Sequence, residues 1–162
     1  MTFFANFLNS SLYPLQSNFG RLIAAVLGFL VGSVVNMAIV WVGPKVIPLP
    51  DGVEMSGTDK LVENIKLLKL VNFLASWLAH ALGTLVGAFV AAKLSVQNRT
   101  RPAVIVGTLF LLGGISMAWM VGGSTWLILT DLVGAYLPMA FWSTWLAEQK
   151  SPRKLGFETE AF

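Results

Sequence analysis

Three polar residues, Asn36, His80 and Asp131, lie inside long apolar segments of the chain. An ionised aspartate at the centre of a membrane-spanning helix costs about 2.5–3.5 kcal/mol on insertion scales, so Asp131 should face other helices and be paired or protonated. His80 is the single histidine and the expected titratable partner within the apolar segments. We therefore predict a His80–Asp131 pair with Asn36 nearby, because pairing would satisfy both ionisable side chains.

The depths of these residues follow from the helix rise of about 1.5 Å per residue. This rise places Asn36 roughly 9 Å and Asp131 roughly 8 Å below the outer ends of their helices, and His80 roughly 15 Å below. Helix tilt would bring His80 within side-chain reach of the other two. Ser76 and Thr84 lie one turn on either side of His80 and would complete a polar network.

Such a cluster has three interpretations. It locks the helices together, or it forms a polar site, open toward the outer face, for a proton, an ion or a small polar ligand. In the third interpretation His80 is an axial ligand to haem or a chlorophyll-type pigment, and Gly83 and Gly87 leave room for the ring.

The composition excludes several kinds of site. The chain has no cysteine, which excludes disulfides, thiolate nucleophiles, cysteine–zinc sites and iron–sulfur clusters within it. One histidine excludes a multi-histidine metal site, so we expect no metal. No nucleophile accompanies the Asp–His pair, and we predict that the protein is not an enzyme.

The elements that must position the cluster are membrane-spanning helices. Of the 162 residues 56% are hydrophobic and 12% charged, about half the charged fraction of a soluble domain. Four apolar segments reach the roughly 20 residues that a bilayer requires. They cover residues 22–42, ended by Gly43 and Pro44, then 70–94, 102–121 beginning at Pro102, and 126–147. Continuous apolar runs favour helices over barrel strands, so the fold class is an all-α bundle of four transmembrane helices.

The flanking segments complete the organisation. Residues 1–19 are expected to form an interfacial helix or a flexible segment, residues 20–147 the transmembrane domain, and residues 148–162 a cytoplasmic tail. Within the first outer loop, residues 58–69 should form a short amphipathic helix, with Thr58 as its N-cap.

The positive charges predict the orientation. The loop after the second span, the tail and the residue before the first span carry Lys or Arg with few acids, whereas the first loop balances four lysines with four acids. Because cytoplasmic loops are enriched in Lys and Arg, both termini are predicted to be cytoplasmic. The net charge of +3 suits anionic lipid headgroups and not nucleic acid.

Small residues predict how the helices pack. In lipid, close helix contacts need small side chains, and the second span carries one at every fourth position. These are Ala75, Ala79, Gly83, Gly87 and Ala91. We expect this ridge to pack against Gly28 and Gly32 of the first span, although it could instead mediate dimerisation. Pro138 should kink the fourth span.

Two stretches, GSVVNMAIVWVGPKVIPLPDGV (residues 32–53) and HALGTLVGAFVAAKL (residues 80–94), resemble a family of small, functionally uncharacterised bacterial membrane proteins with four spans. The resemblance covers about residues 21–147. It implies a bacterial inner membrane and a four-helix layout, and it carries no known activity or site residues.

The sequence therefore favours a non-enzymatic membrane protein that acts as a structural or accessory subunit of a complex or as a homo-oligomer. The alternative is a small transporter or channel component that uses Asn36, His80 and Asp131. A haem- or pigment-binding subunit comes third, and an intramembrane enzyme is weaker still.

Overall fold

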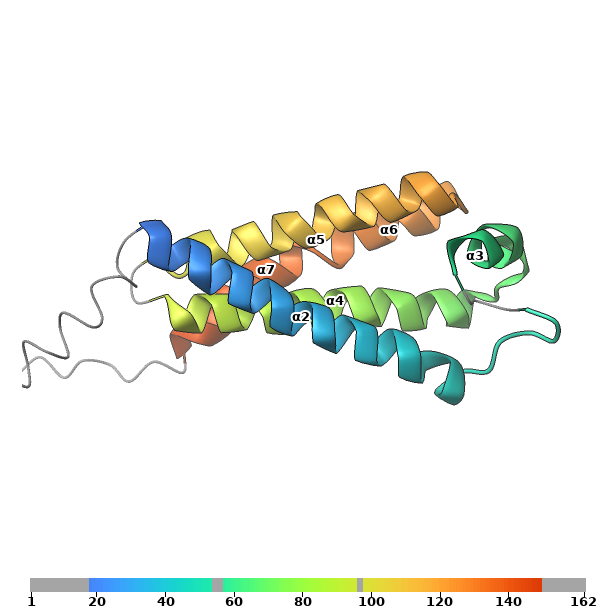
Figure 1. Ribbon diagram of the computed structural model, residues 1–162, viewed down its shortest axis with the longest axis horizontal. Helices are drawn as coiled ribbons and strands as arrows, with labels where there is room; N and C mark the ends of the chain where they lie inside the picture. The colour runs from blue at the N-terminus through green and yellow to red at the C-terminus, as the bar shows by residue number, and fades with distance from the viewer. Residues whose placement is uncertain (1–17, 54–56, 96–97, 150–162) are drawn as a thin grey trace, which may run out of the picture.

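The computed structural model, described for residues 18–53, 57–95 and 98–149, confirms the predicted all-α membrane bundle. Four helical segments are long and apolar enough to cross a membrane: Asn18–Val46, Leu70–Leu94, Thr100–Val121 and Thr125–Gln149. They run side by side along the long axis of the molecule (Figure 1). The predicted N-terminal interfacial segment, up to residue 17, and the tail after Gln149 lie outside the described residues.

Helices α2 (Asn18–Val46) and α4 (Leu70–Leu94) form the tightest contact in the bundle. A Cβ atom added to Gly28 would lie 2.5 Å from the Gly87 carbonyl oxygen, and one added to Gly32 would lie 2.6 Å from that of Gly83. The two backbones therefore touch directly, which gives close van der Waals packing where lipid provides little drive for association. Because α2 covers the small-residue ridge that includes Ala79, this ridge is not free to mediate dimerisation.

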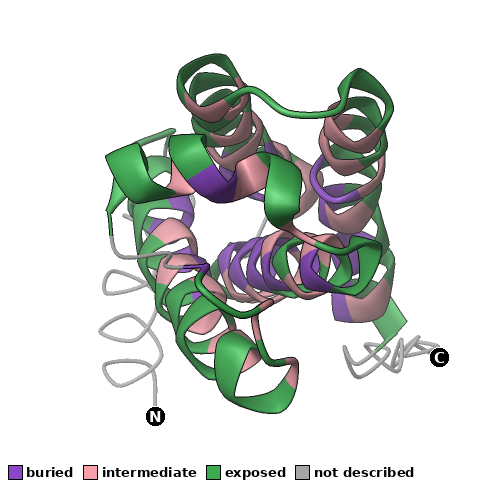
Figure 2. Ribbon diagram, turned by 90° about the vertical axis from the view of Figure 1, so that its right-hand side faces the viewer, coloured by how far each residue is buried: buried purple, intermediate pink, exposed green. Residues whose placement is uncertain are grey.

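Helix α5 (Thr100–Val121) closes the bundle at the end where α2 begins. A core of small residues fills this end, consisting of Ala25, Ala88, Ala91, Ala92, Ala103, Val106, Ala140 and Ala147. Figure 2 shows the buried residues in purple, where the helices face one another. The rings of Phe29 and Phe110 pack against it with their centroids 5.0 Å apart. This contact joins α2 to α5 at the inner margin of the site described below.

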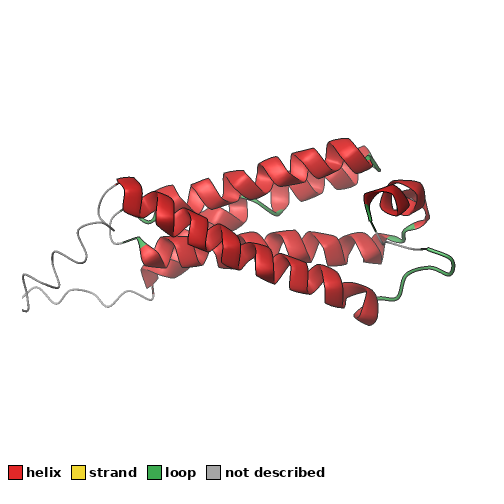
Figure 3. Cartoon of the chain, in the orientation of Figure 1, coloured by secondary structure: helices red, strands yellow, loops and turns green. Residues whose placement is uncertain are grey.

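The fourth span is broken and not merely kinked. It consists of α6 (Thr125–Gly134) and α7 (Leu137–Gln149), separated by Ala135 and Tyr136 (Figure 3). Pro138 lacks the N–H that a continuous helix would need for the carbonyl of Gly134, and it lies instead in the first turn of α7, where a proline is tolerated. The break therefore replaces the predicted kink.

Two predicted helix ends are wrong. α2 does not stop at Gly43 and Pro44, because the amide of Ile47 still donates to the carbonyl of Gly43 at 2.8 Å and carries the helix past the proline. Lys45 supports this last turn by placing its Nζ 3.2 Å from the centre of the Trp41 ring. α5 begins at Thr100, so Pro102 is its third residue and not its first.

The first loop carries the predicted short helix across the end of the bundle (Figure 1). It comprises α3 (Thr58–Asn64) and a 3₁₀ turn, Ile65–Leu67, and its N-cap is Gly57 instead of Thr58. At the start of α4, the Asn72 side chain accepts from the amide of Lys69 at 3.1 Å and donates to the carbonyl of Pro48 at 3.5 Å. These bonds tie the loop to the bundle.

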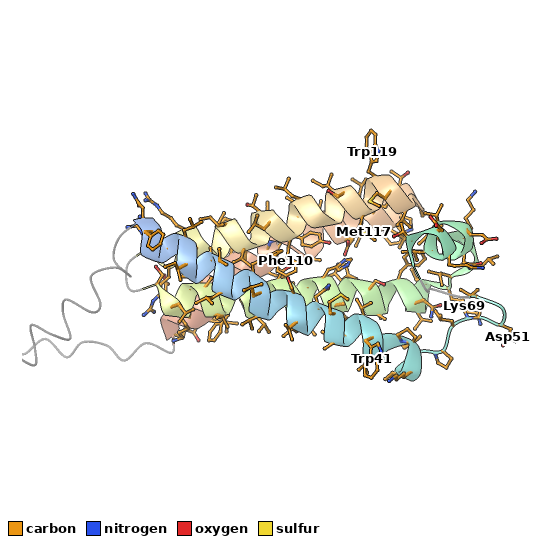
Figure 4. The ribbon with its side chains drawn as sticks, in the orientation of Figure 1. Trp41, Asp51, Lys69, Phe110, Met117 and Trp119 are labelled. Carbon is orange, nitrogen blue, oxygen red and sulfur yellow. The ribbon has the colours of Figure 1, made fainter. Side chains whose placement is uncertain are left out.

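Tryptophans mark the same end of the molecule. Trp41 and Trp119 project away from the bundle (Figure 4) and are 69% and 90% exposed. Amphipathic rings favour the depth of the lipid headgroups, so their position agrees with a membrane boundary at this end.

Candidate intramembrane polar site

His80 of α4 and Asp131 of α6 are in contact. Nδ1 of His80 lies 3.0 Å from Oδ1 and 2.9 Å from Oδ2 of Asp131. Helix α4 presents His80 beside the ridge that packs on α2, and α6 presents Asp131 one turn before the break in the fourth span. The sequence-predicted partners are thus brought together from segments 51 residues apart.

Tyr136 is the third member of this group, and sequence reasoning missed it. Its hydroxyl donates to Oδ2 of Asp131 at 3.2 Å, and its ring stacks on His80 with the centroids 5.7 Å apart. The residue is 1% exposed, and its hydroxyl fills the space where any Cβ at Gly114 would lie. The signal that could have found it is a single tyrosine within the apolar spans, five residues after Asp131.

The hydrogen bonds define what the imidazole can do. When Asp131 is ionised its oxygens only accept, so Nδ1 of His80 carries the proton that they share. In the neutral ring Nε2 is then an acceptor, and in the imidazolium it is a donor. A carboxylate behind an imidazole fixes the tautomer and the orientation of the ring.

Asn36 of α2 lines the same cavity but does not bond to the pair. Its Oδ1 is buried without a hydrogen-bond partner among the described residues. Its Cβ contacts the α4 backbone, because a Cβ added to Gly83 would lie 2.8 Å from it. Asn36 is therefore held by the helix crossing, with this acceptor enclosed among the packed helices.

Ser76 and Thr84 do not complete the network as expected. Ser76 is exposed, and Thr84 is fully buried with no hydrogen bond for its Oγ1 within the described part of the chain. Residues four apart share a helix face only approximately, because the 100° step per residue turns each successive one by about 40°. That rotation takes both hydroxyls off the line from His80 to Asp131.

A cavity of about 210 Å³ lies against the group. It is bounded by α2, α5, His80 and Tyr136, and its other lining residues are Phe29, Asn36, Leu109, Phe110, Gly113, Gly114 and Met117. Figure 4 shows Phe110 and Met117 on the side of α5 that faces the bundle. The side chains of His80 and Asp131 remain 29% and 24% exposed.

No protein-family model, no curated protein and no solved structure matches this chain. The resemblance to a family of small bacterial membrane proteins therefore stays a prediction, and the site is interpreted from its own geometry.

A second cavity, of about 430 Å³, lies where the first loop meets the turn between α5 and α6. Its lining is Ile65, Lys66, Leu68, Phe73, Gly123, Ser124 and Leu127. It contains none of the predicted site residues and no carboxylate. Among the described residues, no three His, Asp or Glu side chains gather into a metal site.

Proposed function

We propose that the protein is a non-enzymatic small transporter or channel component whose intramembrane site takes up a small polar solute. The observation that supports this best is the contact between His80 and Asp131 at 2.9 Å beside an open cavity. Ionisable side chains within a membrane are costly to keep, and they characteristically mark the path of an ion, a proton or a solute.

A purely structural lock agrees less well with the geometry. A polar cluster that holds helices together stabilises the fold most when all its polar atoms are hydrogen-bonded inside the bundle. A network with unsatisfied members is less stable than an apolar core. Here Oδ1 of Asn36 is buried without a partner among the residues that the structure describes, and the imidazole and carboxylate are partly exposed. The exposed parts of the imidazole and the carboxylate offer hydrogen-bonding capacity to a solute.

The other two hypotheses receive less support. The ridge that suggested self-association is covered by α2, so an accessory or homo-oligomeric role would need another surface. A haem- or pigment-binding role would use Nε2 of His80. A cavity of about 210 Å³ is smaller than the roughly 300–1,000 Å³ of pockets for drug-sized ligands, and it favours a smaller occupant than a pigment ring.

For the location we propose the bacterial inner membrane with both termini in the cytoplasm. Helix α4 ends and α5 begins at the end where α2 starts, and this end carries Arg21, Lys93, Arg99 and Arg101. The side with Lys and Arg in short loops faces the cytoplasm in most membrane proteins. The site would then open toward the opposite side.

The test exploits the absence of native cysteines. Gly113 lines the cavity, and a Cβ there would have no neighbour within 4 Å, so Gly113→Cys places one thiol in the site. Val34→Cys is the control, because Val34 is 70% exposed on α2. We expect a small water-soluble methanethiosulfonate reagent to modify Gly113→Cys in lipid nanodiscs and to leave Val34→Cys unmodified, since lipid excludes both the reagent and the thiolate.

Equal resistance of both thiols would contradict the proposal, because a solute site must admit water. Both variants are first checked for helical content and for a single elution peak. The denatured variants must also react fully, which shows that each thiol is present and competent.

A further inference from the structure

We propose that the solute is an uncharged amphiphile that enters the site from the bilayer, between α2 and α5. Its small head, which both donates and accepts hydrogen bonds as a hydroxyl does, lies at His80, and its apolar chain lies in the opening. This inference rests on the proposed function and specifies the class of the solute and its route. It follows from the position of the opening, its depth in the membrane and the residues that line it.

Helices α2 and α5 are in contact near the start of α2 and diverge toward the opposite end of the bundle (Figure 1). The rings of Phe29 and Phe110 pack with their centroids 5.0 Å apart, and a Cβ added to Gly32 would lie 3.0 Å from Cε2 of Phe110. Gly113, one turn farther along α5, lines the cavity, yet a Cβ built there would meet nothing within 4 Å among the described residues. The cavity therefore has an opening between the two helices at Gly113.

The opening lies within the depth of the hydrocarbon core. From the helix rise, Gly113 is roughly 12 Å from the last residue of α5 and roughly 20 Å from its first residue. Leu109 and Met117, which line the cavity one turn on either side of Gly113, are 40% and 45% exposed. Because the hydrocarbon core is about 30 Å thick, side chains exposed at this depth face lipid chains. A molecule dissolved in the bilayer can therefore reach the cavity from the side.

The polar end of the cavity suits a hydroxyl whatever the charge of the pair. Nδ1 of His80 contacts Asp131, so Nε2 is the ring nitrogen left for a ligand, and 29% of the side chain is exposed. Nε2 accepts or donates a hydrogen bond according to the tautomer and the charge of the ring. A hydroxyl both donates and accepts, so it pairs with every form, whereas an ammonium group only donates and a carbonyl only accepts.

The other walls suit an apolar chain. Leu109, Phe110 and Met117 border the cavity on α5 and Phe29 borders it on α2, and no Lys, Arg, Asp or Glu is among the residues that line it. Its volume of about 210 Å³ is below the roughly 300–1,000 Å³ of pockets for drug-sized ligands, so it encloses the head while the chain extends through the opening. Inside hydrocarbon a hydroxyl has lost its water, and a hydrogen bond to His80 compensates this loss for an alcohol but gives nothing to an alkane.

The test uses dodecan-1-ol and dodecane, each with a diazirine in the middle of its chain, as photoreactive probes. The full-length protein is illuminated with either probe in nanodiscs of phosphatidylcholine, and mass spectrometry locates the labelled residues. The readout is labelling of Leu109 and Met117 relative to Ile115, which is exposed on α5 but does not line the cavity, so that different partitioning of the probes cancels. We expect this ratio to be about fivefold higher for the alcohol than for the alkane, and an excess of unlabelled dodecan-1-ol should remove the difference.

Variants separate the opening from the polar end. Gly113→Leu places a side chain in the opening, where its Cβ has free space, and it should lower the ratio for the alcohol to that of the alkane. Val34→Leu is the control, because it enlarges a 70% exposed side chain on α2 that does not line the cavity, and it should leave the ratio unchanged. His80→Phe keeps a ring without nitrogens and should also remove the preference for the alcohol. Equal ratios for both probes in the unaltered protein, or an undiminished ratio in a folded Gly113→Leu variant, would overturn the inference.

Two further arms identify the source of the head and separate the two proposals. Hydroxyls occur on simple alcohols and on glycerides, and displacement of the probe by monododecanoylglycerol assigns the site to glycerides, whereas no displacement assigns it to simple alcohols. Gly113 borders the cavity as well as the opening, so dodecan-1-ol should slow the aqueous modification of Gly113→Cys and dodecane should not. If Gly113→Cys is modified but the two probes label alike, only this inference fails. If Gly113→Cys is not modified in the absence of probe, the proposed function fails as well.

Discussion

Tyr136 donates its hydroxyl hydrogen to Asp131 across the break between α6 and α7 while its ring stacks on His80. The break in the fourth span and the ionisable pair are therefore one structural unit, because the residue that interrupts the helix is also the residue that completes the polar group. This relationship leads to four predictions about stability and conformation.

Tyr136→Phe should keep the fold and lose one hydrogen bond to Asp131. Hydrogen bonds between membrane helices contribute about 0.6 kcal/mol on average and up to about 1.7 kcal/mol, so we expect a loss of that size in the free energy of unfolding. Denaturation in mixed detergent micelles measures it. Thr130→Val is the control, because that hydroxyl bonds to its own helix at an exposed position and its removal should change stability less.

The His80–Asp131 pair should show strong coupling in a double-mutant cycle. His80→Phe leaves Asp131 without the imidazole, and Asp131→Leu leaves Nδ1 of His80 and the Tyr136 hydroxyl without their acceptor. Each group left unsatisfied costs about 1–3 kcal/mol of stability. The double variant removes the imidazole and the carboxylate together and leaves only the Tyr136 hydroxyl without its acceptor, so it should be more stable than the sum of the single effects predicts. Additive losses in the unfolding free energies would show that the two side chains do not interact.

Gly28→Ala should destabilise the bundle, whereas Gly43→Ala should not. The new methyl group at position 28 would lie 2.5 Å from the backbone of Gly87, but at position 43 it would meet only the Cβ of Ala75 at 3.6 Å, an ordinary contact. Overpacking typically costs about 1–3 kcal/mol. Thermal unfolding of the two variants, which lie in the same helix, provides the comparison. Equal midpoints would mean that α2 and α4 do not touch at Gly28.

Pro138→Ala should allow α6 and α7 to join into one helix, because the new amide N–H can donate to the carbonyl of Gly134. Spin labels on cysteines at positions 125 and 149 would report this as a longer distance by double electron–electron resonance. Pro44→Ala, in the exposed last turn of α2, is the matched control and should leave that distance unchanged. An unaltered distance in Pro138→Ala would show that tertiary packing alone maintains the break.

The contact of His80 with Asp131 and the packing of Gly28 and Gly32 on Gly83 and Gly87 could both be anticipated from the amino-acid sequence. A costly carboxylate in lipid requires a partner, and the chain offers one histidine. Small residues four apart form a ridge on any helix. These inferences depend on composition and helical period, which are properties of the chain before it folds.

Four spans and their apolar character were likewise determined by the sequence alone, because the thickness of the bilayer imposes the length of each helix. Only the tertiary structure decided that the fourth span breaks at Tyr136, that this tyrosine joins the pair, and that Ser76 and Thr84 do not. Those outcomes depend on how far each helix is rotated about its axis and on which side chain fills the space between neighbouring helices. The Tyr136 hydroxyl, for example, occupies the space that a side chain at Gly114 would need. The rotation of each helix and the fit of its side chains against its neighbours are set only when the helices pack together, so they cannot be predicted from one segment of the sequence.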